Sequence, residues 1–184
     1  MKLQRFDIAG PALLISTKHA DARGFFAEIF RKDALEREIG PIDFMQDNHS
    51  CSAKTGTVRG LHFQVAPTAQ AKLVRVVRGA ILDVAVDLRK SSPTYGRHVA
   101  ATLSAENFAQ LYIPVGFAHG FCTLEPDTEV VYKVSNYYDP STEKGLQWND
   151  PALKIVWPVA SDAATISDKD RDYPPLSQLG TWFT

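Results

Sequence analysis

The chain has 184 residues, a length typical of one domain with a sizeable hydrophobic core. Its hydrophobic fraction of 45% and charged fraction of 22% are those of an ordinary soluble globular protein. The formal net charge of -1 argues against a broad surface for nucleic acid or membranes, and it is compatible with a local cationic pocket for a phosphorylated small molecule. We therefore expect no nucleic-acid partner and no membrane partner.

Cysteine usage and the N-terminal stretch indicate the compartment. Cys51 and Cys122 are too few for a disulfide framework and form no CxxC pair. Residues 1–7 are charged and lack the apolar core of a secretory signal, and no segment is long and apolar enough to cross a bilayer. We expect two reduced thiols in a cytoplasmic protein.

The N-terminal segments alternate between short apolar stretches and polar breaks. Residues 3–15 are predicted to form short strands, and residues 16–23 a polar loop. Residues 23–30 are predicted to form a strand whose alternation places Glu28 between two aromatic residues on one face. That arrangement is unusual for a plain core strand, although an edge strand with a solvated Glu28 explains it equally well.

The next segment contains the best helix candidate. Residues 32–39 carry Asp33 near their start and are followed by Gly40, which predicts one short peripheral helix. Residues 44–50 return to a strand pattern, and residues 52–56 are predicted to turn.

Closely spaced strand segments follow from Val58 onward. They are predicted at residues 72–77, 80–88, 99–103, 108–114, 116–124 and 129–136. Such regular spacing, with turn signals between the strands and no alternating helices, is typical of an antiparallel sandwich or barrel. Residues 139–184 contain three tryptophans, and we expect them to wrap the barrel in irregular structure.

The run Arg59-Gly60-Leu61-His62-Phe63-Gln64 contains the first candidate for chemistry. On a strand, His62 shares its face with Gly60 and Gln64, so its ring overlooks a small residue and a polar one. On the residues alone, a hydrogen-bonded structural histidine is the commoner explanation, and a catalytic base is the alternative.

His119 is the second candidate. It ends the run Pro114-Val115-Gly116-Phe117-Ala118-His119, whose P-x-G-x-x-H spacing resembles the second motif of the cupin superfamily, jelly-roll barrels that often hold a metal. The first cupin motif supplies a His-x-His pair, but the matching place here reads His62-Phe63-Gln64, with no carboxylate at a suitable interval. Because transition metals need several imidazole or carboxylate ligands, we expect no metal.

A longer set of motifs makes the resemblance specific. They are Arg23-Gly24-Phe25-Phe26-Ala27-Glu28, Gln46-Asp47-Asn48-His49-Ser50, Arg59-Gly60-Leu61-His62-Phe63-Gln64, Lys72-Leu73-Val74-Arg75, Asp83-Val84-Ala85-Val86-Asp87, Ile113-Pro114-Val115-Gly116-Phe117-Ala118-His119-Gly120-Phe121, Tyr132-Lys133, Asn136-Tyr137-Tyr138, Trp148-Asn149-Asp150 and Ser167-Asp168-Lys169-Asp170. In this order, through nearly the whole chain, they resemble the dTDP-4-dehydrorhamnose 3,5-epimerase family.

The resemblance implies a mainly β, cupin-type jelly roll with a few short peripheral helices, formed by residues 1–184 as one domain. It also implies a reaction: 3,5-epimerisation of dTDP-4-dehydro-6-deoxy-D-glucose to dTDP-4-dehydro-L-rhamnose, for dTDP-rhamnose and surface polysaccharide (O-antigen) synthesis. Proton removal next to the C4 ketone needs a base, a group that stabilises the enolate oxygen, and an acid on the opposite face. We expect no cofactor.

The resemblance assigns roles to four residues: His62 as base, Asp170 as its carboxylate partner, Lys72 as the cation beside the keto oxygen, and Tyr132 as proton donor. An imidazole titrates near neutrality, and a paired carboxylate stabilises the imidazolium. On the residues alone, we would interpret Asp170 as a solvated acid, Lys72 as a surface lysine and Tyr132 as a half-buried strand tyrosine.

The resemblance also implies substrate contacts. These are Arg23 and Arg59 for the diphosphate, Glu28 with Gln46, Asp47 and Asn48 for the thymidine, Phe26 and Tyr138 stacking on the base, and His119, Glu143 and Lys169 in less defined roles. Within an apolar stretch, Asp83 is costly unless paired, and we expect it to brace His119 or Lys72.

The family also implies a homodimer in which N-terminal strands are exchanged, so that Arg23, Phe26 and Glu28 enter the partner's site. Residues 65–69 are more apolar than the family pattern and the tail after Arg171 departs from it, which leaves fine substrate choice open. The alternatives are an epimerase that inverts one carbon, a metal-dependent cupin oxygenase, and a non-catalytic module that binds a sugar nucleotide.

Overall fold

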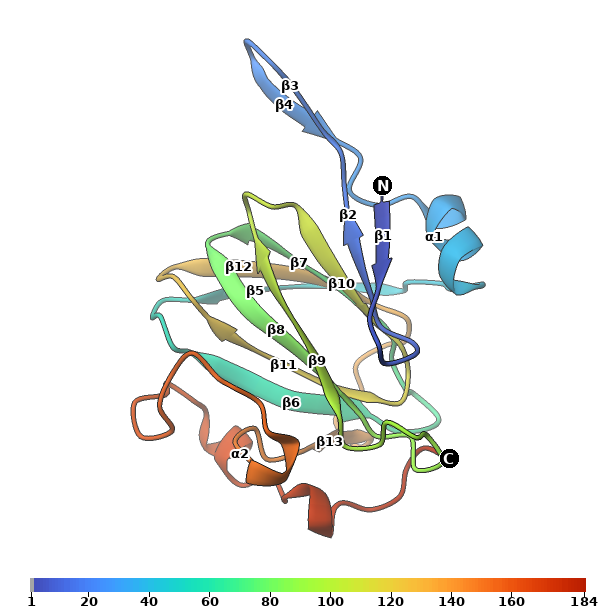
Figure 1. The fold of residues 1–184 in the computed structure, drawn as a ribbon, viewed down its shortest axis with the longest axis vertical. Coiled ribbons are helices and arrows are strands. Elements are labelled where there is room, and N and C mark those ends of the chain that lie inside the picture. The colour runs from blue at the N-terminus through green and yellow to red at the C-terminus, as the bar shows by residue number, and fades with distance from the viewer. Residues whose placement is uncertain (1) are drawn as a thin grey trace.

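The computed structural model describes residues 2–184, which form two large sheets, a projecting hairpin and a few short helices (Figure 1). The strands are β1 (Lys2–Arg5), β2 (Ala12–Ile15), β3 (Lys18–Asp21), β4 (Gly24–Ala27), β5 (Gln46–Ser52), β6 (Val58–Gln64), β7 (Lys72–Arg78), β8 (Ala80–Asp87), β9 (His98–Ser104), β10 (Ala109–Ile113), β11 (Phe117–Thr123), β12 (Thr128–Val134) and β13 (Glu143–Gly145). The helices are α1 (Lys32–Ile39), α2 (Asp168–Arg171) and the short 3-10 helices η1 (Pro151–Leu153) and η2 (Leu176–Gln178).

The two large sheets face each other. One has the strand order β1-β2-β10-β7-β12-β5 and the other β13-β6-β11-β8-β9, and the strands within each pair antiparallel. Neighbours such as β10 and β7 are far apart in sequence, as expected when strands cross between two sheets. The fold is the predicted mainly β, cupin-type jelly roll.

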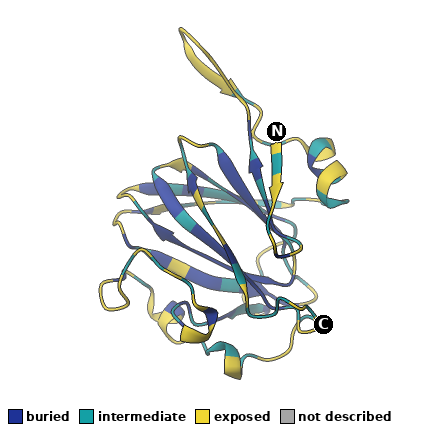
Figure 2. Cartoon of the chain, viewed as in Figure 1, coloured by how far each residue is buried: buried dark blue, intermediate teal, exposed yellow. Residues whose placement is uncertain are grey.

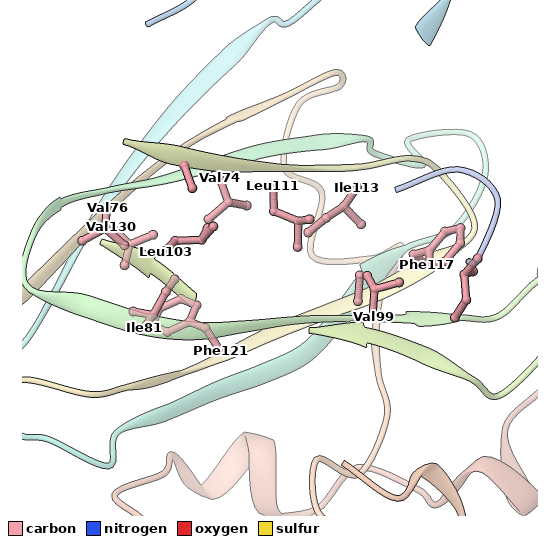
Figure 3. Packing of buried hydrophobic residues seen from close by; sticks show 13 residues of the cluster. Val74, Val76, Ile81, Val99, Leu103, Leu111, Ile113, Phe117, Phe121 and Val130 are labelled. Carbon is pink, nitrogen blue, oxygen red and sulfur yellow. The ribbon is translucent and has the colours of Figure 1, made fainter. Parts of the chain in front are cut away.

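The core lies between the sheets, where the inward side chains of their strands meet (Figure 3). Val74 and Leu111 of the six-stranded sheet face Ile81 and Val99 of the other sheet. Burying each large aliphatic side chain contributes roughly 1.5–3 kcal/mol, so this cluster holds the sheets at a fixed separation. The strands that carry the site are therefore fixed relative to one another.

The outer faces are covered unequally. The C-terminal segment packs on the outside of the five-stranded sheet, where Trp157 and Phe183 lie against a cluster that includes Leu61 (Figure 1). At one end of the other sheet, Leu35 of α1 packs with Leu14. Side chains of the C-terminal segment thus cover this sheet from outside.

The N-terminal hairpin differs from its prediction. Residues 16–23 were expected to form a loop, but β3 pairs with β4 through all four of its residues. The expectation fails because Lys18–Asp21 is exposed throughout and lacks the alternating apolar pattern of a half-buried strand. The predicted strand also stops at Ala27, one residue before Glu28. The hairpin projects from the sheets and is exposed almost everywhere (Figures 1 and 2).

Helix α1 matches its predicted bounds of 32–39. Both cysteines are free thiols, Cys51 at the surface and Cys122 buried. None of the helices within residues 2–184 has the length and apolar character required to cross a bilayer.

Candidate active site

Strand β6 contains an irregularity that decides where its side chains point. Across β11, His119 lies opposite His62 and Phe121 opposite Arg59, so β6 has one more residue than β11 in this interval. Gly60 occupies the bulge with φ of 126°, and a Cβ there would lie 2.6 Å from a backbone atom of β11. As a result Arg59 and His62, three residues apart, line the same cavity.

His62 and Asp170 form a dyad at the wall of this cavity. The His62 Nε2 and Asp170 Oδ1 atoms are 2.7 Å apart, and the second carboxylate oxygen accepts a 3.1 Å hydrogen bond from the Gly60 N–H. Helix α2 presents Asp170, and Ser167 caps its first turn. Burial by itself raises the pKa of Asp170, but the hydrogen bonds and the charge of His62 bring that pKa below its usual value. Asp170 is therefore a carboxylate at neutral pH.

Three predicted catalytic residues are shared by two neighbouring cavities of about 540 and 300 Å³. His62, Lys72 and Tyr132 line both. The larger cavity adds Arg59, His119, Lys169 and Asp170, and the smaller adds Gln46, Asn48, Tyr138 and Glu143. Cavities of these sizes suit a small ligand with several polar groups. The structure thus gathers eleven of the predicted site residues around one hollow.

The two groups beside His62 have perturbed acidities. Burial lowers the pKa of Lys72 to about 8, although the charges of Asp83 and Glu143 oppose that shift. Burial raises the pKa of the Tyr132 phenol, with Arg59 opposing the shift. At neutral pH the cavity therefore contains a cationic lysine and a protonated phenol.

A second histidine–carboxylate pair lies deeper in the barrel. Of the two partners predicted for Asp83, the structure gives His119, whose Nε2 is 2.6 Å from Asp83 Oδ1. Both side chains are buried, and desolvation lowers the pKa of His119 although Asp83 favours its charged form. The second Asp83 oxygen has no hydrogen-bond partner among residues 2–184. His119 is therefore held as a neutral ring facing the cavity.

A polar cluster lines the smaller cavity. The Tyr138 Oη donates a 2.8 Å hydrogen bond to Glu143, which also pairs with Lys169. Gln46 connects to this cluster by accepting a hydrogen bond from the Tyr138 N–H and donating another to Asn48. These side chains, from β5, β13, α2 and the loop between β12 and β13, could bind the polar edge of a nucleoside.

Four predicted binding residues lie elsewhere in the chain. Arg23, Phe26 and Glu28 are on or beside the projecting hairpin, where the Phe26 side chain is 71% exposed and Arg23 pairs only locally with Asp21. Asp47 alternates to the outer face of β5 and pairs with Lys133. One chain by itself does not bring these four residues to the cavity.

The structure adds one residue that sequence reasoning missed. Tyr173 packs against the His62 ring, with centroids 5.7 Å apart and planes at 76°. It lies in the tail after Arg171, where the sequence offers no motif and no periodicity. Residues 2–184 provide no group of three or more His, Cys, Asp or Glu side chains placed to share a metal ion.

Comparison with known proteins gives the family. The sequence model described as dTDP-4-dehydrorhamnose 3,5-epimerase matches residues 5–178. The chain belongs to the dTDP-4-dehydrorhamnose 3,5-epimerase family. It is therefore an isomerase of the carbohydrate epimerase type.

Individual proteins similar to this chain in sequence and in structure support the family assignment. The enzyme of that name from Sinorhizobium fredii is 49% identical over 183 residues, which cover 100% of this chain and 93% of the relative. The Bacillus anthracis epimerase, solved with TDP and PPi bound, is 50% identical with a TM-score of 0.91, covering 95% of this chain and 99% of that one. The Legionella pneumophila epimerase, solved with dTDP-4-keto-L-rhamnose, is 38% identical with a TM-score of 0.92, covering 97% and 94%.

Proposed function

We propose that this epimerase inverts carbons 3 and 5 of dTDP-4-dehydro-6-deoxy-D-glucose to give dTDP-4-dehydro-L-rhamnose, with His62 as the base. The observation that carries the assignment is the 2.7 Å contact between His62 and Asp170 at the wall of a cavity shared with Lys72 and Tyr132. A base, its carboxylate partner, a cation and a neutral acid are the groups that proton transfer beside a ketone requires.

Each inversion proceeds by one proton removal and one proton return. With Nε2 engaged by Asp170, His62 Nδ1 is the ring nitrogen that remains to take the proton from carbon. The electron pair of the broken C–H bond moves onto the C4 oxygen, and the Lys72 ammonium stabilises the resulting enolate charge. Tyr132 then gives its phenol proton to the carbon from the opposite face as the electron pair returns from oxygen to that carbon. The tyrosinate takes a proton from solvent, and His62 releases its proton to solvent. The same sequence serves the second carbon.

The remaining cavity residues bind the substrate. Arg59 is held through hydrogen bonds from its guanidinium to Ser52 Oγ and the Cys51 carbonyl, and it presents a charge suited to the diphosphate. The wall formed by Gln46, Asn48 and Tyr138 takes the thymidine.

Solvent isotope exchange tests the reaction. Incubation of the substrate with the enzyme in deuterated water should place deuterium at both carbon 3 and carbon 5, together with product of the L-rhamno configuration. Exchange at one carbon alone would identify an epimerase that inverts a single centre. Binding without exchange at either carbon would indicate a module that only binds the sugar nucleotide.

The assembly proposed for this enzyme is a homodimer with exchanged hairpins, each subunit being one domain. Phe25 and Phe26 are 59% and 71% exposed on the hairpin, and large exposed aromatic side chains on a projecting segment are typical of an interface. Insertion into a second copy would bury them and would bring Arg23, Phe26 and Glu28 to the partner's cavity. This arrangement gives a role to side chains that a single chain leaves largely exposed.

Complementation between two inactive variants tests the exchange. Arg23→Ala and His62→Asn each disable a different half of a composite site. In a mixed dimer, the subunit that retains His62 receives Arg23 from its partner, so one site of the two is intact. Coexpression at equal amounts should restore roughly a quarter of the wild-type activity, because half of the dimers are mixed. No recovery in a sample shown to be dimeric by sedimentation would contradict the exchange.

The proposed place of the enzyme in the cell is cytoplasmic, in dTDP-rhamnose synthesis for surface polysaccharide. Its substrate carries a diphosphate nucleotide, which is a cytoplasmic form of activated sugar. Fractionation of cells and the loss of rhamnose from surface polysaccharide after gene deletion test this placement.

A further inference from the structure

Tyr173 lies beside the proposed catalytic dyad but lines neither of the two cavities. It follows α2, three residues after Asp170. The Pro174 carbonyl accepts a 2.9 Å hydrogen bond from the Gln147 N–H, which connects this segment to the chain just after β13. Tyr173 therefore occupies a fixed position on the side of His62 that does not face the substrate.

The ring of Tyr173 fits a space that two strands leave open for it. Gly145 of β13 pairs with His62 of β6, and a Cβ on Gly145 would lie 2.2–2.3 Å from three carbon atoms of the Tyr173 ring. The absence of a side chain at Gly145 thus allows the ring to lie directly on the backbone. From there it meets the imidazole edge to face, a geometry that fixes the plane of both rings.

The hydroxyl of Tyr173 does not share in this contact. It is buried and has no hydrogen-bond partner among residues 2–184. Burial raises its pKa and the charge of Glu143 acts in the same direction, while the Lys169 ammonium nearby opposes the shift without reversing it. The phenol is therefore neutral at neutral pH and lies outside both cavities, and the part of the side chain that contacts His62 is its ring.

We infer that Tyr173 is a positioning residue for the epimerisation: its ring holds the imidazole of His62 in the plane in which Nε2 meets Asp170 and Nδ1 remains for the substrate. Asp170 holds one nitrogen, and the bond to Cβ holds the other end of the ring, which leaves the imidazole free to tilt about the line between those two points. The edge-to-face contact with Tyr173 removes that freedom. This inference rests on the proposed role of His62 as base.

Two substitutions separate the ring from the hydroxyl. Tyr173→Phe keeps the aromatic edge and removes the unpartnered hydroxyl, so its turnover should match wild type and its Tm should rise by about 2–4 °C. Tyr173→Leu keeps a similar apolar volume without a flat ring, so kcat should fall by about 10- to 100-fold, the usual cost of a misplaced catalytic group. The KM should change little, because Tyr173 lines neither cavity.

Two further measurements exclude a general structural effect. The Kd for dTDP should stay the same in both variants. NMR spectra of enzyme with isotope-labelled histidine report on the His62 ring, whose signals are identified by their loss in His62→Asn. These signals should shift in Tyr173→Leu and keep their positions in Tyr173→Phe. If the leucine variant does not fold, Tyr173→Met replaces it, because a flexible thioether fills irregular gaps.

The inference is overturned if Tyr173→Leu turns over within about two-fold of wild type, or if leucine and phenylalanine cause the same loss. The proposed function and this inference fail in different ways. Normal turnover in His62→Asn would remove the base itself, whereas an inactive His62→Asn beside a fully active Tyr173→Leu would remove only the positioning role.

Discussion

Replacement of Lys72 by methionine is expected to stabilise the fold while it removes most of the activity. Lys72 is buried, and desolvation lowers the pKa of its ammonium from 10.5 to about 8. At roughly 1.4 kcal/mol per pKa unit, keeping this group charged in the folded protein at pH 7 costs about 3 kcal/mol. Methionine has a similar length and carries no such cost. We infer that the charge is retained for the enolate and not for stability.

The sign of the effect follows from proton binding in the two states. Below about pH 8 the lysine is protonated both folded and unfolded, so the full cost is present. As the pH rises from about 8 toward 10.5, the folded protein releases the proton while the unfolded chain keeps it. The wild type is therefore stabilised relative to the variant, by about 2 kcal/mol between pH 7 and 9.5. The attraction of Asp83 for the ammonium is already included in the net shift to about 8.

Urea denaturation at pH 7 and pH 9.5 measures this difference. The free energy of unfolding of Lys72→Met minus that of wild type should fall by about 2 kcal/mol between the two pH values, with equal m-values. Lys54→Met, at an exposed position, is the matched control and should show no such change. Turnover of Lys72→Met should fall by at least about 10²-fold. The reasoning would be refuted if the difference in unfolding free energy between Lys72→Met and wild type did not depend on pH, or if Lys72→Met had normal turnover.

Three further substitutions test the other groups in the cavity. His62→Asn should lower turnover by about 10²–10⁴-fold in steady-state assays and leave dTDP binding, followed by calorimetry, largely intact; near-normal turnover would exclude it as the base. Tyr132→Phe should slow product formation more than deuterium exchange into the substrate, because proton removal does not need the phenol; a parallel loss of both would contradict its role as donor. Arg59→Ala should raise KM by about 10-fold with a smaller effect on kcat, and an unchanged KM would make it a structural arginine.

Local sequence patterns predict much of the fold because, in most strands and in α1, the spacing of apolar residues shows which side is buried and the end residues show where the element stops. Residues 32–39 carry an acidic start and a glycine stop, and the helix has those bounds. Strands that bury one or both faces, such as β8 and β11, are visible as apolar runs. The hairpin strand Lys18–Asp21 is exposed along its whole length, so no apolar pattern marks it.

The candidate site depends on contacts that no local pattern contains. Asp170 meets His62 across 108 positions of sequence, and Asp83 meets His119 across 36. Resemblance to the family supplied the first pair as an expectation. Tyr173 had neither a motif nor a pattern to mark it, and its contact with His62 exists only because α2 packs beside β6 and β13.

Periodicity in the chain predicts a sandwich or barrel of strands and one peripheral helix, and the order of the motifs, through the family resemblance, predicts the jelly roll and most of the residues around His62. Which of those side chains meet depends on the tertiary structure. Simple alternation separates Arg59 from His62 by placing them on opposite faces of a strand, and the bulge at Gly60 turns both toward the cavity. That bulge is set by how β6 packs on β11, and close packing between two strands depends on both partners at once.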